Sequence, residues 1–316
     1  MDPLSDNSLD KVPSSELKNE IQTQTGLVKE VKKEIIPGTD EMARLALEQY
    51  ESETGDLTAQ NIRNNFNELI QDLIKTETVI YEELEENFVN EIVPYYMENY
   101  YSNESADSYP MIQSMFENVE TAYTDSDSFE EFITEGFERL YPFAGHVYFS
   151  ASQGRKTRVG DTLENHLELL LTRMGYPLES QVKIGDSPID IILPNKKTFN
   201  QNPENSIFLP CQTTLKDRFR LSLSKLPSGN KYDPVSKYIT TTTGVNLITD
   251  ADQNDITTQK IDETVDAGYK ILAFEEVKQQ FPTHDGIISY TEFVNEVLPE
   301  KAESWDVDVQ EELSKF

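Results

Sequence analysis

The sequence contains a single cysteine, Cys211, and no long run of hydrophobic residues. One cysteine cannot form a disulfide within the chain, and its place in an apolar segment favours a buried, reduced thiol. No window approaches the roughly 18 apolar residues of a membrane-spanning helix, and the first residues lack the basic and apolar regions of a secretion signal. We therefore expect a soluble, cytoplasmic protein without a membrane partner.

Basic side chains are also scarce, with 27 Lys and Arg against 58 Asp and Glu and a formal net charge of -31. Taken over the whole chain, this acidity argues against nucleic-acid binding, because phosphate contacts need a basic surface. The distribution changes that conclusion. Residues 1–150 carry 32 acidic and 9 basic side chains, residues 227–316 carry 18 and 7, but residues 151–226 carry 8 and 11. The acidic majority is typical of a surface that stays hydrated in concentrated salt, which suggests a halophilic source.

The N-terminal half is predicted to be helical. Residues 1–40 are polar with few aromatics, which predicts a flexible N-terminal arm. From 41 to 145, apolar residues recur at three- and four-residue steps, which predicts an acidic, all-helical domain. Thr58 is expected to cap one of its helices. The acidic runs 82–83 and 85–86 are expected to be solvated helix faces. The apolar positions include Ile62, Phe66, Leu69, Ile70, Leu73, Phe88, Ile92, Met115, Phe129, Phe132, Ile133 and Phe137.

A second domain is predicted over residues 150–316. Pro142 and Gly145 interrupt the helical pattern, and 150–154 has the composition of a linker. The alternation of elements that follows predicts an α/β sandwich around a mixed central sheet. The expected strands are 181–185, 188–193, 206–214, 238–243 and 271–274, and the expected helices are 162–171, 216–226, 255–267 and 287–298.

Two polar residues interrupt the apolar strands of this second domain. Asp190 follows Ile189 and precedes Ile191, and Gln212 follows Cys211. A carboxylate among aliphatic side chains costs several kcal/mol unless it is paired, and a divalent metal ion is one such partner. The alternative is that Asp190 caps a turn after Pro188.

Residues 155–282 resemble the catalytic domain of EcoRII-type restriction endonucleases. These enzymes belong to the PD-(D/E)xK nuclease superfamily, in the branch that cuts CCGG- or CCWGG-type sites. The resemblance rests on four blocks in order, of which the third is the most specific because it is similar to the family's K-T-T-x-K-D-R-W-R. The blocks are Arg155-Lys156-Thr157-Arg158 with Leu163-Glu164-Asn165-His166-Leu167-Glu168, Pro188-Ile189-Asp190, Gln212-Thr213-Thr214-Leu215-Lys216-Asp217-Arg218-Phe219-Arg220, and Tyr238-Ile239-Thr240-Thr241-Thr242.

The resemblance implies a restriction-endonuclease-like fold and a type II restriction endonuclease that hydrolyses double-stranded DNA at a palindromic site with CC/GG half-sites. Its cofactor would be Mg²⁺ and its partners a second copy or higher homo-oligomer, with a cognate DNA methyltransferase in the same system. Asp190 would be the first metal ligand. Pro210 stands at the usual place of the second carboxylate, and Glu164 could supply it instead, unless Glu164 is a surface or capping residue.

The resemblance also assigns DNA contacts and raises one question about activity. An Arg beside an Asp can read guanine and cytosine edges, while other cations contact phosphates. Gln212 stands where the family has lysine, and a neutral amide cannot activate water electrostatically. Two alternatives therefore stay open, a nuclease-fold protein that binds DNA without cutting it and an acidic module that mimics DNA or binds a partner. The residues that the resemblance assigns to the DNA backbone are Arg155, Lys156 and Arg158. Those that it assigns to DNA from the recognition helix are Lys216, Asp217, Arg218 and Arg220.

Overall fold

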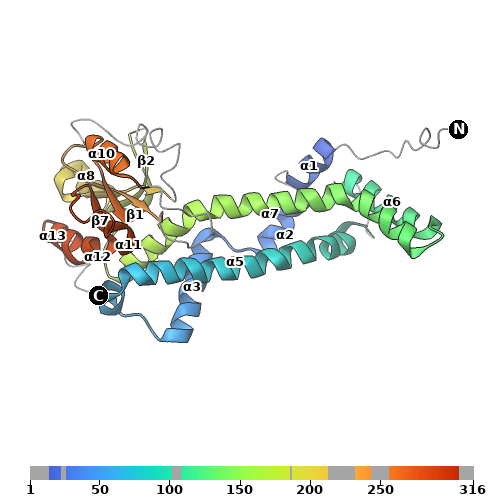
Figure 1. Ribbon diagram of the computed structural model, residues 1–316, viewed down its shortest axis with the longest axis horizontal. Helices are drawn as coiled ribbons and strands as arrows, with labels where there is room; N and C mark the ends of the chain where they lie inside the picture. Colours follow the sequence, from blue (N-terminus) through green and yellow to red (C-terminus); the bar gives the residue numbers. More distant parts are fainter. Residues whose placement is uncertain are drawn as a thin grey trace. The chain divides into compact units, whose positions relative to one another are not determined.

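The computed structural model describes residues 14–22, 26–101, 108–185, 187–212, 232–242 and 256–305. The chain divides into two compact units. The helical unit comprises residues 1–38 and 81–157, and the sheet unit comprises residues 39–80 and 158–316. Two long helices, α5 (Phe66–Tyr96) and α7 (Phe129–Arg173), contribute residues to both units (Figure 1). The expected helical segment 41–145 is thus shared between the two units.

The helical unit includes part of the segment that was expected to be a flexible arm. Residues 14–22 form α1 (Ser14–Gln22) and residues 27–35 form α2 (Leu27–Ile35). Leu27, Val28 and Val31 are buried on one face of α2, because three- and four-residue spacing aligns them along the helix. Three apolar residues in an otherwise polar segment are too few to predict a packed helix from the sequence. The unit also contains η1 (Met97–Tyr101) and α6 (Pro110–Asp125).

α1 is tied to α6 by a carboxylate. Glu20 accepts hydrogen bonds from the backbone N–H groups of Met111 and Ile112, each at 3.1 Å. These groups belong to the first turn of α6, where backbone donors have no partner within the helix. Glu20 therefore satisfies two donors that the sequence of α6 leaves open.

α7 is continuous across the predicted break and linker. The expectation that Pro142, Gly145 and residues 150–154 end a helix is wrong, since all lie within Phe129–Arg173. Phe143, Val147 and Ala151 recur at four-residue steps and are buried in the core of the helical unit. Tertiary packing of this face overrides the weak local preference of Pro and Gly against helix.

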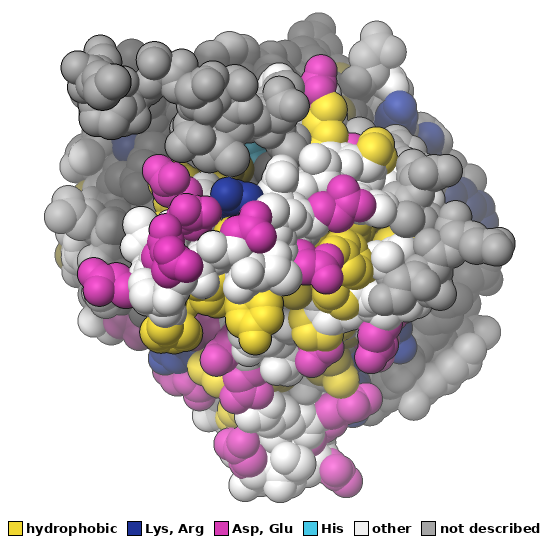
Figure 2. All heavy atoms as spheres, turned by 90° about the vertical axis from the view of Figure 1, so that its right-hand side faces the viewer, with side chains coloured by type: hydrophobic (Ala, Val, Ile, Leu, Met, Phe, Trp, Pro, Cys, Tyr) yellow, Lys and Arg dark blue, Asp and Glu magenta, His cyan; other side chains and the backbone are white. Residues whose placement is uncertain are grey.

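The first part of α7 leaves aromatic side chains exposed. Phe129 is 78% exposed, Phe137 68% and Tyr141 63%. They follow one another at four- or eight-residue steps, which explains why the sequence pattern placed Phe129 and Phe137 in a core. Figure 2 shows hydrophobic side chains set among acidic ones at this end of the molecule.

The sheet unit contains a seven-stranded mixed sheet in the order β1-β2-β3-β5-β6-β7, with β4 paired to β5. The pairs β1–β2 and β2–β3 are antiparallel, and the remaining pairs are parallel. The predicted α/β fold with a mixed sheet is confirmed. The strands are β1 (Glu179–Ile184), β2 (Ser187–Leu193), β3 (Ile207–Leu209), β4 (Cys211–Gln212), β5 (Ser236–Thr241), β6 (Lys270–Ala273) and β7 (Ile287–Ser289).

One strand was missed, and one predicted helix lies outside the described residues. Residues 287–289 form β7 instead of opening the C-terminal helix, because they pair in parallel with β6. The expected helix 216–226 is not among the described residues. The helices and short turns of the sheet unit are α3 (Thr39–Thr54), α4 (Ala59–Asn64), α8 (Lys196–Gln201), η3 (Pro203–Asn205), α10 (Thr258–Asp266), α11 (Glu275–Lys278), α12 (Tyr290–Glu292), η4 (Phe293–Val297) and α13 (Leu298–Ala302).

The sheet has a buried cluster on each face. β3 separates the two, since Ile207 and Leu209 belong to the larger cluster and Phe208 to the smaller one. The larger cluster joins the sheet to α4, α5, the end of α7 and the C-terminal helices. The predicted cap is confirmed, because Thr58 accepts from the N–H of Asn61 at 3.1 Å. Among the described helices, none is both long and apolar enough to cross a membrane.

A buried charged cluster joins α5 to α7 inside the sheet unit. Glu77 is 2% exposed and accepts a hydrogen bond from the hydroxyl of Thr162 at 3.0 Å. His166 Nε2 lies 2.9 Å from Glu77 Oε2, and Arg158 Nε lies 3.8 Å from Glu77 Oε1. Residues 158, 162 and 166 follow one another at four-residue steps, so one face of α7 presents all three to a single carboxylate.

Removing this carboxylate should destabilise the sheet unit. We expect Glu77→Ala to lower the free energy of unfolding by about 3–5 kcal/mol, because the buried Arg158, Thr162 and His166 side chains would lose the carboxylate that they face. Denaturant unfolding measures the change. The matched control is Asp72→Ala on the same helix, whose exposed pair with Lys75 should be worth less than about 1 kcal/mol. Equal losses in both variants would contradict a structural role for the Glu77 cluster.

Candidate active site

Asp190 lies within β2 and connects that strand to β4. Its Oδ2 accepts a hydrogen bond from the backbone N–H of Cys211 at 2.7 Å. Cys211 directly precedes Gln212, and both residues pair in parallel with β5. The structure therefore brings Asp190 close to the chain at Gln212, as the resemblance implied. The alternative role, in which Asp190 caps a turn after Pro188, is not observed, because the carboxylate bonds to a strand 21 residues away.

Glu164 extends toward the same place from α7. It is 8% exposed and its Oε1 accepts a hydrogen bond from Gln181 Nε2 on β1 at 2.6 Å. Glu164 lies in the interior of a long helix, so it is neither a surface residue nor a cap. Three elements, α7, β1 and β2, thus place two carboxylates in one region of the sheet unit.

The two carboxyl groups carry unfavourable electrostatic energy. The pKa of Glu164 is raised to about 7, chiefly by burial and also by the negative charges of Asp190 and Asp161, against the lowering effect of the hydrogen bond from Gln181. Burial also raises the pKa of Asp190, against the opposing effect of the Cys211 N–H, and Asp161 adds to the rise. Burial and the charge of Asp190 raise the pKa of the Cys211 thiol, which keeps it protonated and unreactive. Among the described residues, the charged groups that act on Glu164 are all acidic.

A divalent cation fits this pair. Mg²⁺ prefers oxygen ligands, and it is commonly held by one or two carboxylates together with water and substrate phosphates. Asp190 and Glu164 supply that number of carboxylates, and their mutual repulsion would be relieved by a cation between them. Among the described residues, no group of three or more His, Cys, Asp or Glu side chains could form a full protein cage for a metal. The arrangement is therefore an open site.

The remaining predicted residues have different outcomes. Arg158 was predicted to contact the DNA backbone; its side chain is 10% exposed and lies against Glu77. Gln212 is half-buried in β4. Arg155 and Lys156 lie on α7, and their side chains are outside the described part of the structure. Lys216, Asp217, Arg218 and Arg220 also lie outside the described residues.

Gln181 is a site residue that the sequence did not reveal. It occupies an alternating strand as an ordinary polar residue, and only its contact with Glu164 singles it out. Asp161 was missed for a similar reason, since its influence on both carboxyl groups depends on how α7 packs against the sheet.

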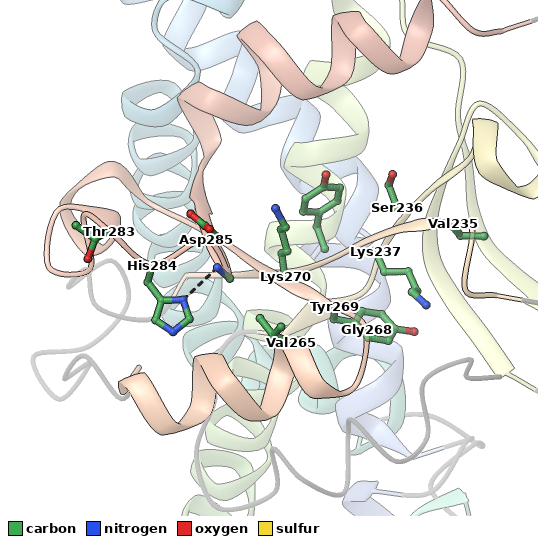
Figure 3. Close-up of a pocket in the computed structure, with 12 residues that line it drawn as sticks. Val235, Ser236, Lys237, Val265, Gly268, Tyr269, Lys270, Thr283, His284 and Asp285 are labelled. Carbon is green, nitrogen blue, oxygen red and sulfur yellow. Dashed lines mark hydrogen bonds between the residues drawn. The ribbon is translucent and has the colours of Figure 1, made fainter. Parts of the chain in front are cut away.

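A cavity of 610 Å³ lies at the other ends of the parallel strands (Figure 3). It is lined by the starts of β5 and β6 and by the loop before β7. The side chains of Lys237 and Lys270 point away from each other, so they do not converge on one ligand (Figure 3). Lys237 donates to the carbonyl of Tyr232 at 3.0 Å, and His284 lies 3.1 Å from Asp262. The carboxylate pair is the better candidate for chemistry.

Stability should depend on pH through Glu164. A carboxyl group whose pKa is raised on folding contributes stability below its unfolded pKa and loses that contribution as pH rises through about 7. The metal-free protein should therefore lose on the order of 2 kcal/mol between pH 5 and pH 8, since one pKa unit corresponds to about 1.4 kcal/mol. Glu164→Gln should show a smaller loss in denaturant unfolding at the two pH values. The prediction fails if both proteins show the same pH dependence.

Comparisons with known proteins identify the family of this chain. The family described as EcoRII C terminal matches residues 119–294, which is more than half of the chain. The type II restriction enzyme SsoII from Shigella sonnei is 28% identical over 103 residues, which are 30% of this chain. The matched segment spans 32% of the length of SsoII, about a third.

Solved structures agree on the fold. Metal-depleted Ecl18kI in complex with uncleaved DNA matches with a TM-score of 0.67 and 16% identity over 96% of this chain and 91% of that chain. Its complex with uncleaved, modified DNA matches with a TM-score of 0.68 and 15% identity over the same shares. The likeness covers both the helical region and the mixed sheet, so the predicted fold class is confirmed. The chain belongs to the EcoRII C-terminal family of restriction endonuclease domains.

Proposed function

We propose that this protein is a sequence-specific, metal-dependent type II restriction endonuclease that hydrolyses double-stranded DNA. The observation that carries the proposal is the pair formed by Asp190, which is half-buried, and Glu164, which is buried. Membership in the restriction endonuclease family supports it. The solved relative is described as metal-depleted and bound to uncleaved DNA, which is consistent with a metal-dependent cut.

Mg²⁺ is the proposed cofactor. When bound, it would stabilise charge on the phosphate and lower the pKa of the attacking water. Asp190 and Glu164 would hold the ion, and Glu164 would release its proton as the ion binds, because its pKa lies near 7. Gln212 would hydrogen-bond to the water or phosphate, but it cannot add a positive charge.

DNA recognition is proposed from the resemblance. Arg218 and Asp217 would read guanine and cytosine edges of a palindromic site with CC/GG half-sites, flanked by Lys216 and Arg220. Arg155 and Lys156 would contact phosphates. We leave Arg158 out of this set, because Glu77 engages it inside the sheet unit.

A palindromic target also implies two-fold symmetry, so we propose a homodimer or a higher homo-oligomer. A DNA methyltransferase of the same specificity would protect the host genome. The acidic surface should repel DNA at low ionic strength, and salt screens that repulsion. The assays should be run at high KCl, because salt screens this repulsion and because the proposed source is halophilic.

A second candidate function is a nuclease-fold protein that binds DNA without cutting it. The specific observation in its favour is Gln212, which stands in β4 where the family has lysine. A third candidate is an acidic module that mimics DNA, which the charge of residues 1–150 favours. Titration with duplex DNA separates the first two candidates from the third, and addition of Mg²⁺ separates the first from the second.

Cleavage should depend on Asp190. We expect Asp190→Ala to reduce Mg²⁺-dependent cutting by more than about 100-fold, because a metal supplies several kcal/mol of transition-state stabilisation. Binding to the same duplex without metal should persist. Plasmid cleavage followed by end sequencing, with a gel-shift assay beside it, measures both. Asp266→Ala, an exposed carboxylate on α10, is the control and should cut normally. Cleavage by Asp190→Ala at the wild-type rate would contradict the proposed active site.

Restoring the family's lysine should increase activity. Gln212→Lys would place a cation beside the attacking water, while Asp190 and Glu164 would still hold the metal. We expect a higher single-turnover rate at saturating Mg²⁺. Gln212→Met, which also lacks charge and has a similar length, is the control and should not show the increase. An unchanged or lower rate for Gln212→Lys would mean that the site uses another source of electrostatic activation.

A further inference from the structure

The pairing of β1 with β2 is irregular at the candidate site. Ser180 pairs with Ile191 and Val182 pairs with Ile189, so Gln181 and Asp190 fall opposite each other between these positions. Their own pair is absent from the ladder between the two described strands. Gln181 has a φ of 51°, and it is the one non-glycine residue with positive φ among the described residues.

β2 departs from regular alternation at the same point. Ile189 packs in the smaller cluster with Ile192, whereas Ile191 packs in the larger cluster with Leu193. A regular strand would place Ile189 and Ile191 on one face, because side chains alternate with a period of two. The alternation therefore breaks at Asp190. Both strands therefore leave regular geometry at the step where Gln181 and Asp190 fall opposite each other.

The left-handed backbone at Gln181 is costly for any residue with a side chain, and glycine would adopt it freely. Strain of this kind is concentrated at functional sites, where the surroundings hold it in place. At Gln181 the surroundings include one strong contact, the 2.6 Å hydrogen bond from Nε2 to Glu164 Oε1. The bond is made to Oε1, one of the two carboxylate oxygens of Glu164.

The charge of the donor is also relevant. Gln181 is neutral, so it orients the carboxylate without neutralising it and without repelling a cation. A lysine or arginine at this position would neutralise the carboxylate and would repel a metal cation. Asp190 is held in the same way, by the neutral backbone N–H of Cys211. Both carboxyl groups thus receive their hydrogen bonds from neutral donors, which add no positive charge at the place of a metal ion.

We infer that Gln181 is a positioning residue, which fixes Glu164 beside Asp190 so that the pair can bind a divalent cation. The inference rests on the proposed function, since it assumes that these two carboxylates hold a metal. It deepens that proposal by assigning the irregular step in β1 to metal binding.

Metal affinity measured without DNA tests this inference. Mn²⁺ is titrated into the metal-free, full-length protein and its Kd is measured by calorimetry or electron paramagnetic resonance. Gln181→Gly removes the amide and keeps a residue that accepts positive φ, so the backbone stays in place. We expect this variant to bind Mn²⁺ about 10–100-fold more weakly, as is usual when a partner of a metal ligand is lost. Gln181→Asn, which keeps a shorter amide, should fall between Gln181→Gly and wild type.

Ser180→Gly is the matched control, because it makes the same change at the adjacent residue of β1 and leaves Glu164 bonded. It should bind Mn²⁺ as wild type does. Far-ultraviolet circular dichroism confirms folding of each variant. In cleavage assays, Gln181→Gly should need about 10–100-fold more Mn²⁺ for half-maximal rate and should recover at high Mn²⁺, which a general loss of structure would not produce.

The outcomes separate the inference from the proposed function. If Gln181→Gly binds Mn²⁺ as tightly as wild type while Asp190→Ala and Glu164→Ala bind it weakly, the metal site stands and the role of Gln181 is overturned. If all variants bind Mn²⁺ like wild type, or if wild type does not bind it at millimolar concentration, the proposed metal site fails and the inference fails with it.

Discussion

The site depends on one constraint: Asp190 is half-buried, Glu164 is buried, and the charged groups of the described residues that act on them are acidic. Asp190 and Glu164 each have a raised pKa, chiefly because burial disfavours their charged forms, and Asp190 adds to the effect at Glu164. A fold gains no stability from such a pair at neutral pH. A positively charged ligand such as the proposed Mg²⁺ would relieve this cost, and the neutral donors Gln181 and Cys211 N–H bond to the two carboxyl groups.

α7 connects this site to the core of the sheet unit. Arg158, Thr162 and His166 face Glu77 on α5, while Glu164 faces β1. The alternation follows from the helical repeat, since residues 162 and 164 are separated by about 200° around the helix axis. The buried cluster at Glu77 thus fixes the rotation of α7, and that rotation directs Glu164 toward Asp190. Arg158, which the resemblance assigned to DNA, contributes to this cluster.

The helical unit shows how packing replaces local preference. Pro142, Gly145 and Gly154 all discourage helix, yet Phe143, Val147 and Ala151 keep α7 helical through this region. At Gly154, a Cβ atom would come within 2.9 Å of Lys32 Nζ and 3.0 Å of the Tyr81 hydroxyl. The ends of these two long side chains thus lie against α7 at Gly154, which in the sequence has the composition of a linker.

The sequence by itself determined the apolar strands, the cap at Thr58, the mixed α/β class and the identity of Asp190 as an unusual core carboxylate. These follow from local patterns, because strand and helix periodicity and the cost of burying a charge can be read over a few residues. From the sequence, Glu164 could be either the second metal ligand or a surface or capping residue, because its burial depends on the packing of α7. The tertiary structure alone decided that Gln181 bonds to Glu164, that Arg158 is buried against Glu77, that residues 287–289 pair as a strand, and that α7 does not break. Each of these depends on contacts between segments far apart in the chain, and no local pattern encodes them.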